Sequence, residues 1–129
     1  MNKFVIDAHA WIEYFNGTES GEKVKEIIEN SKNRIYTNVI TIAELSSSFS
    51  RKNNDFEEAK KIIASLSLFY LIDKDFAEES GKLHATLKKE RKNIGLADIF
   101  VLLTARKLNA KVITGDEDFK GLKEVILIK

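Results

Sequence analysis

Four carboxylates stand in or beside strongly apolar segments, where an unpaired charge is costly to bury. They are Asp7 after residues 4–6, Glu44 within residues 39–45, Asp98 within residues 96–103, and Asp116 after residues 111–115. Neither Glu44 nor Asp98 has a Lys or Arg three or four residues away, where a helix would supply a partner. An ionised carboxylate taken out of water needs such compensation. A shared divalent cation would provide it, so these residues point to a metal-dependent enzyme.

Other acids have ordinary partners and serve as a contrast. Glu57 precedes Lys61 by four residues, and Glu78 precedes Lys82 by four. This spacing predicts ion pairs on the solvent face of a helix. We therefore expect these acids to lie outside any active site.

Composition limits both the size of the protein and the kind of metal it could bind. The chain has 129 residues, 43% of them apolar, which suits one domain over residues 1–129. With no cysteine and two histidines, a metal would have oxygen ligands, as Mg²⁺ and Mn²⁺ prefer. A net charge of +1 means that any nucleic-acid binding must come from a local basic patch. No apolar stretch is long enough for a membrane span and the first segment reads as a strand, so we expect a cytoplasmic protein without membrane contact.

Strand-like and helix-like segments alternate along the chain. Strands are predicted at residues 3–6, 34–37, 69–72, 111–114 and 125–128. Helices are predicted at residues 8–15, 22–30, 39–52, 55–66 (with Asp55 as N-cap), 75–92 and 96–109. This order predicts an α/β fold with a mostly parallel sheet of four to five strands and helices on both faces. Ligands of such sheets bind beyond the carboxyl ends of the strands, where Asp7 and Asp116 fall.

Each acid also has a simpler interpretation. Asp7 and Asp98 could cap the helices that follow them, and Glu44 could face solvent if its helix is rotated. Asp116 and Asp118 could be ordinary turn residues. The metal-site hypothesis therefore depends on all four acids coming together.

Taken in order, several short motifs resemble those of the PIN domain family. In size and layout the whole chain resembles the VapC-type toxins of toxin–antitoxin pairs. The motifs are Phe4-Val5-Ile6-Asp7 with Ala10-Trp11-Ile12, then Thr41-Ile42-Ala43-Glu44-Leu45, then Gly95-Leu96-Ala97-Asp98, and last Ile113-Thr114-Gly115-Asp116-Glu117-Asp118-Phe119. The resemblance spans essentially the whole chain and implies a PIN-like three-layer fold.

The resemblance also implies a function. In this sequence Asp7, Glu44, Asp98 and Asp116 would be the catalytic residues and would hold one or two Mg²⁺ or Mn²⁺ ions. Thr114 would orient the last carboxylate or a metal-bound water, and Asp118 would be an auxiliary ligand. The implied reaction is hydrolysis of RNA phosphodiester bonds by a metal-activated water, and the implied partners are an antitoxin protein and a second copy of the chain.

One departure from the family pattern concerns the residues that follow the first Asp. The family often has a small hydroxyl residue there, whereas this chain has Ala8 and His9. A hydrogen bond behind the metal ligands is then lost unless His9 replaces it.

Substrate phosphates would need cations near the acids. The densest basic run contains Lys88, Lys89, Arg91 and Lys92, and Arg51 ends the helix that carries Glu44. Binding through such residues is expected to weaken with salt. The run equally fits a solvated helix end favoured by the helix dipole.

Three other functions remain open from the sequence. The first is a housekeeping PIN-domain nuclease that processes RNA. The second is a phosphoacceptor signalling domain, but it usually has two adjacent acids after its first strand and a Lys near its last, and both are missing here. The third is a catalytically silent binding domain, which the presence of all four acids disfavours.

Overall fold

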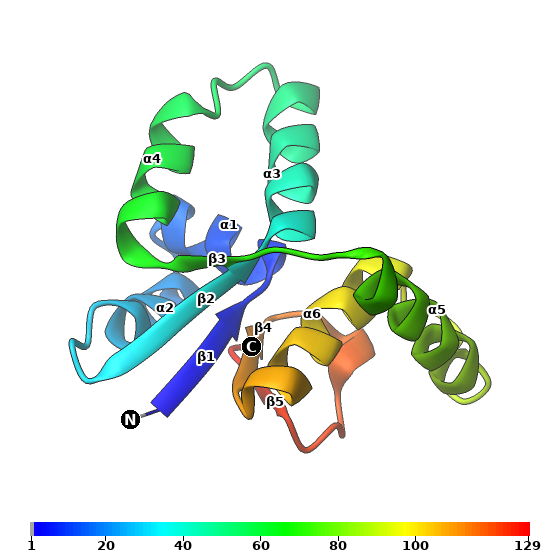
Figure 1. The fold of residues 1–129 in the computed structure, drawn as a ribbon. Helices are drawn as coiled ribbons and strands as arrows, with labels where there is room; N and C mark the ends of the chain where they lie inside the picture. The colour runs from blue at the N-terminus through cyan, green and yellow to red at the C-terminus, as the bar shows by residue number, and fades with distance from the viewer. Residues whose placement is uncertain (1) are drawn as a thin grey trace.

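The computed structural model describes residues 2–129 and shows an α/β fold built on one five-stranded sheet (Figure 1). The strands are β1 (Asn2–Ile6), β2 (Asn33–Asn38), β3 (Leu68–Tyr70), β4 (Lys111–Thr114) and β5 (Val125–Leu127). The helices are α1 (Ala8–Asn16), α2 (Glu19–Ile28), α3 (Val39–Arg51), α4 (Glu57–Leu66), α5 (Lys74–Lys88) and α6 (Leu96–Leu108), with a short 3-10 helix, η1 (Glu117–Phe119). Every strand pair is parallel, in the order β3-β2-β1-β4-β5.

The two faces of the sheet are covered by different helices, which gives three layers. Alternate side chains of β1 separate the faces, as parallel strands require. Ile6 packs in a cluster with α1, α2, α3 and α4, whereas Val5 packs against α6. A further cluster joins Phe76 of α5 to Phe100 on α6, so α5 lies outside α6. The predicted α/β fold, a parallel sheet with helices on both faces, is confirmed.

Helix α6 is the central support of its face. Its residues from Ile99 to Ala105 are all buried, and the helix ends where Asn109 adopts a left-handed conformation at φ 55°. Asn is one of the few residues that tolerate this conformation at a helix end. The run of apolar residues is long because both sides of the helix are covered, one by the sheet and the other by α5.

Several predicted boundaries and pairs need correction. The third strand is Leu68–Tyr70 instead of residues 69–72, and the helix predicted to reach residue 92 ends at Lys88. The fourth helix begins at Glu57 after Phe56; Asp55 is not its N-cap, although its Oδ1 accepts the Glu57 N–H at 3.0 Å.

The expected surface ion pairs are half right. Lys82 Nζ lies 3.5 Å from Glu78 Oε2, as predicted. Glu57, however, pairs with Lys60 at 3.1 Å and not with Lys61. Both spacings place the partner one turn along the same helix face, so the sequence alone does not choose between them.

Within residues 2–129, none of the helices combines the length and the apolar character that crossing a membrane requires.

Candidate active site

Three carboxylates from the carboxyl end of the sheet and the start of α6 meet at one point. Ligand oxygens of Asp98, Asp116 and Asp118 all lie within 4.8 Å of one another, and all three residues are half-buried. Asp116 follows β4 and Asp118 lies in η1, while Asp98 occupies the first turn of α6. Asp118, predicted to be an auxiliary ligand, therefore lies as close to Asp98 and Asp116 as these two lie to each other. The sequence signal for its position is the spacing of two residues after Asp116, across one turn of η1.

Asp7 lies at the base of the site and is held by two donors. Its Oδ1 accepts the Ala10 N–H at 2.9 Å and caps α1, while its Oδ2 accepts the Thr114 hydroxyl. The residue is 6% exposed. Burial is the main reason that its pKa rises from 3.8 to about 7; the two hydrogen bonds oppose the rise, and the charges of Asp98 and Glu44 add to it. Asp7 thus caps a helix and lies within electrostatic range of Asp98 and Glu44, but it is outside the group of three acids whose oxygens meet.

The helix that carries Glu44 is fastened to the sheet by a buried amide. Asn38 Oδ1 accepts the Ile40 N–H at 2.7 Å and caps α3, and Asn38 Nδ2 donates to Thr104 Oγ1 of α6 at 2.8 Å. Asn38 is fully buried at the carboxyl end of β2. Sequence reasoning did not single out this residue, although an Asn between a strand and a helix is a recognisable cap signal.

Glu44 borders the cluster from α3. The residue is exposed overall, yet the protein around its carboxyl desolvates it enough to raise its pKa. The charges of Asp98 and Asp116 raise that pKa further, which places Glu44 within electrostatic range of both. Of the four acids expected to be buried, Asp7 alone is buried in full.

Asp98 also has two roles. Its Oδ2 accepts the Gly95 N–H at 2.8 Å and closes the first turn of α6. Such a capping contact is the alternative to metal binding that was predicted from the sequence. Burial raises the pKa of Asp98, and the charges of Asp116 and Asp118 raise it further. His84 lowers the same pKa by its charge and lies beside the turn, with Nε2 3.2 Å from the Ile94 carbonyl.

Thr114, predicted to orient the last carboxylate or a metal-bound water, contacts both the first and the last of the four acids. Its hydroxyl donates to the carboxylate of Asp7, the first acid, and accepts the backbone N–H of Asp116 at 3.0 Å. The carboxylate of Asp116 instead accepts the Asp118 N–H at 2.9 Å. A single hydroxyl therefore ties the end of β1 to the loop after β4.

His9 packs beside this loop. A Cβ placed on Gly115 would lie 2.6 Å from two atoms of the His9 ring, so the ring occupies the space that a side chain would need. His9 Nε2 lies 3.3 Å from Lys129 Nζ, and within residues 2–129 its buried Nδ1 has no hydrogen-bond partner. His9 thus contacts the backbone that carries Asp116. The lost hydroxyl contact to the first Asp is supplied by Thr114.

The basic residues proposed for RNA binding divide into two groups. Arg91 donates to the backbone carbonyls of Asp118 and Lys120, at 3.2 and 2.6 Å, and so positions the acidic loop. Lys92 joins Arg91 and Asp118 in lining a shallow hollow of about 210 Å³ beside the cluster. Lys88 donates to the Lys92 carbonyl at 2.7 Å.

Lys89 and Arg51 are exposed at the ends of α5 and α3, and Arg51 donates to the Ser47 carbonyl of its own helix. Of the five basic residues, Arg91 and Lys92 line the hollow beside the acids.

The sequence matches the PIN domain family model over residues 4–125, and the chain belongs to this family. No curated protein matches the sequence of this chain.

Several solved structures with the same fold are described as toxins or toxin–antitoxin complexes. A toxin–antitoxin complex from Klebsiella pneumoniae has 25% identity and a TM-score of 0.71, over 97% of each chain. VapBC-1 from nontypeable Haemophilus influenzae has 22% identity and a TM-score of 0.71, over 98% of each chain. VapC20 from Mycobacterium tuberculosis, described as a toxin that cleaves the sarcin–ricin loop, shares the fold at 12% identity with a TM-score of 0.73, over 93% of this chain and 95% of its own. The resemblance to VapC-type PIN domains is confirmed.

Proposed function

We propose that this protein is a divalent-metal-dependent endoribonuclease and the toxin of a toxin–antitoxin pair. The observation that carries the proposal is the cluster of Asp98, Asp116 and Asp118, bordered by Asp7 and Glu44, at the carboxyl end of a PIN-domain sheet. The likeness to the VapBC complexes supports the choice of a toxin over a housekeeping nuclease.

The donor set fits a hard cation. All the candidate ligands are carboxylate oxygens, and three of them already lie within 4.8 Å of one another. The pKa values of four acids are raised: Asp7, Glu44, Asp98 and Asp118. The fold therefore places these carboxylates where desolvation and repulsion between neighbouring charges both disfavour their ionised forms. One or two Mg²⁺ or Mn²⁺ ions would relieve both costs. When bound, such an ion lowers the pKa of a coordinated water and neutralises charge on phosphate oxygens.

The other residues of the site prepare its geometry. Ala10 N–H and the Thr114 hydroxyl hold both oxygens of Asp7, and Gly95 N–H holds one oxygen of Asp98. Arg91 holds the backbone at Asp118, which leaves the side chain of Asp118 free to face the cluster. Lys92 lies where it can bind a phosphate that flanks the bond to be cut.

The decisive variant is Asp98→Asn, which keeps the shape of the residue and an oxygen for the Gly95 N–H. We expect it to abolish metal-dependent cleavage of single-stranded RNA while circular dichroism and the melting temperature stay close to wild type. Retained cleavage would remove Asp98 from the site. Toxicity on expression, relieved by the product of an adjacent small reading frame, separates a toxin from a housekeeping nuclease.

We also propose that two copies associate, in addition to binding an antitoxin. The edge strand β3 and the segment after it expose Leu68, Phe69 and Leu71, and Leu71 is 76% exposed. A cluster of exposed apolar residues on a sheet edge is unusual for an isolated protein. Light scattering of wild type and Leu71→Glu tests this, and an unchanged monomer in both would contradict it.

A further inference from the structure

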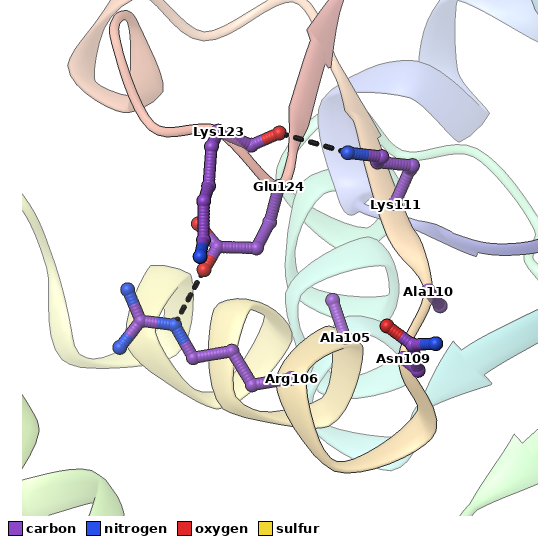
Figure 2. A pocket seen from close by; sticks show the side chains of 7 residues that line it. All are labelled: Ala105, Arg106, Asn109, Ala110, Lys111, Lys123 and Glu124. Atoms are coloured by element: carbon purple, nitrogen blue, oxygen red, sulfur yellow. Dashed lines mark hydrogen bonds and ion pairs between the residues drawn. The ribbon is translucent and has the colours of Figure 1, made fainter.

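A polar hollow lies at the opposite end of α6 from the acids (Figure 2). It has a volume of about 570 Å³, and its polar lining consists of Arg106, Asn109, Lys111, Lys123 and Glu124. Arg106 stands eight residues after Asp98 on the same helix, a rise of about 12 Å. The hollow is thus separate from the acidic cluster, yet within reach of a strand a few nucleotides long.

The hollow carries more positive than negative charge. Arg106 Nε donates to Glu124 Oε2 at 2.8 Å, and Figure 2 shows its two terminal nitrogens directed away from that carboxylate. Lys111 Nζ donates to the backbone carbonyl of Lys123 at 3.0 Å, a contact that leaves its charge uncompensated. Three cations therefore face one carboxylate. Outside the hollow, Lys3 and Arg34 are the second residues of β1 and β2 and stand in register with each other.

Glu124 contributes an oxygen that needs a donor. Its Oε1 is buried and has no hydrogen-bond partner within residues 2–129, and its side chain is 12% exposed. Burial opposes ionisation, but the hydrogen bond from Arg106 and the charges of Arg106 and Lys123 act against it, and the pKa of Glu124 is lowered. A buried acceptor without a donor destabilises the fold. A ligand that brings an O–H or N–H group would remove this cost.

We propose that this hollow binds one nucleotide of an RNA strand at a distance from the bond that is cut, through Arg106, Lys111, Lys123 and Glu124. The phosphate contacts the terminal nitrogens of Arg106 and the two lysines, and the ribose 2′-hydroxyl donates to Glu124 Oε1. An acidic protein segment would also satisfy the cations and would bring backbone N–H donors. RNA is the ligand proposed because it is the substrate proposed for the neighbouring acidic site, and competition with polyglutamate distinguishes the two. The 2′-hydroxyl distinguishes RNA from DNA. This inference rests on the proposed function, since RNA is the substrate assumed there.

The test measures binding without cleavage. A fluorescein-labelled 12-nucleotide RNA and the DNA of the same sequence are titrated with protein in EDTA, and anisotropy is followed at several salt concentrations. The double variant Lys111→Gln/Lys123→Gln removes two phosphate contacts from exposed positions. We expect weaker RNA binding and a slope of log affinity against log salt that is shallower by up to about 0.7, since a single phosphate is bound there. Glu124→Gln is expected to reduce the preference for RNA over DNA.

The matched control is Lys60→Gln/Lys61→Gln, which removes the same charge from the exposed face of α4. It should bind RNA with the wild-type slope. The proposal is overturned if the hollow variant and the control behave alike or if Glu124→Gln keeps the wild-type preference. It is also overturned if polyglutamate displaces RNA from wild type but not from the hollow variant, because the hollow would then bind an acidic protein segment. Failure of the proposed function has a different signature, because wild type would then cleave no RNA in Mn²⁺ whatever the binding data show.

Discussion

Asp7→Asn offers a quantitative test of the charge balance in the site. The pKa of Asp7 lies at about 7 in the folded protein, against an ordinary value of 3.8. Because the folded state holds this proton more tightly, stability falls as pH rises from about 4 to about 7, and the loss is complete above that range. The gap between the two pKa values corresponds to about 4 kcal/mol. Asparagine cannot ionise, so the variant should not suffer this loss.

The assay is urea unfolding of the metal-free protein at pH 5 and pH 8. About 3 kcal/mol of the Asp7 effect falls between these two values. We expect wild type to be less stable at pH 8 by at least this amount, since Glu44 and Asp98 also have raised pKa values and act in the same direction. In Asp7→Asn the difference should shrink by about 3 kcal/mol. The Ala10 N–H and the Thr114 hydroxyl can still bind the asparagine amide, so the fold should be kept.

Divalent metal supplies the second half of this test. At pH 8, Mg²⁺ at about one hundred times its Kd should return about 2.7 kcal/mol to the wild type and clearly less to Asp7→Asn. Asp75→Asn is the control, because Asp75 is 80% exposed and pairs with Lys74 on the surface. It should retain the full difference between pH 5 and pH 8. Equal pH dependence in wild type and Asp7→Asn would refute the account of Asp7 as a buried, desolvated acid.

The remaining predictions concern metal, surface charge and backbone space. EDTA should stop RNA cleavage and Mn²⁺ should restore it; turnover that persists in EDTA ends the metal hypothesis. Glu57→Gln should leave activity intact because Glu57 pairs with Lys60 on the surface. A loss of activity would contradict the criterion that an acid with a cationic partner one helical turn away lies outside the active site. Gly115→Ala should lower stability by about 1–3 kcal/mol through overpacking against the His9 ring. Chemical denaturation measures this cost, and adding His9→Ala should recover part of it.

Much of the fold follows from hydrophobic pattern alone. The buried run of α6 and the strands on either side of it are unambiguous, since α6 is covered by the sheet and by α5. The boundaries at Leu68–Tyr70 and Lys88 were less predictable. β3 is an exposed edge strand of three residues, and the chain after Lys88 has the same charged composition as the helix before it. In such places tertiary contacts decide where an element ends.

The candidate site was predictable to the extent that burial and spacing reveal it. Asp7 and Asp98 stood out because apolar residues surround them, and capping contacts turned out to be part of their role instead of an alternative to it. The place of Asp118 depends on the turn of η1, and the bond from Thr114 to Asp7 depends on β4 lying beside β1. Contacts between strands distant in sequence have no local signature, so the partner of Thr114 could not be assigned from its neighbours.

The pairing of β1 with β4 also determines when, during translation, the candidate site can be completed. Asp7 leaves the ribosome early, but the hydroxyl of Thr114 and the carboxylates of Asp116 and Asp118 lie more than one hundred residues further along the chain. A nascent chain therefore carries Asp7, and later Glu44 and Asp98, without the strand that must lie against β1. If the protein is a toxin, it cannot damage RNA while most of it is still being translated, and a neutralising protein has that interval in which to be made.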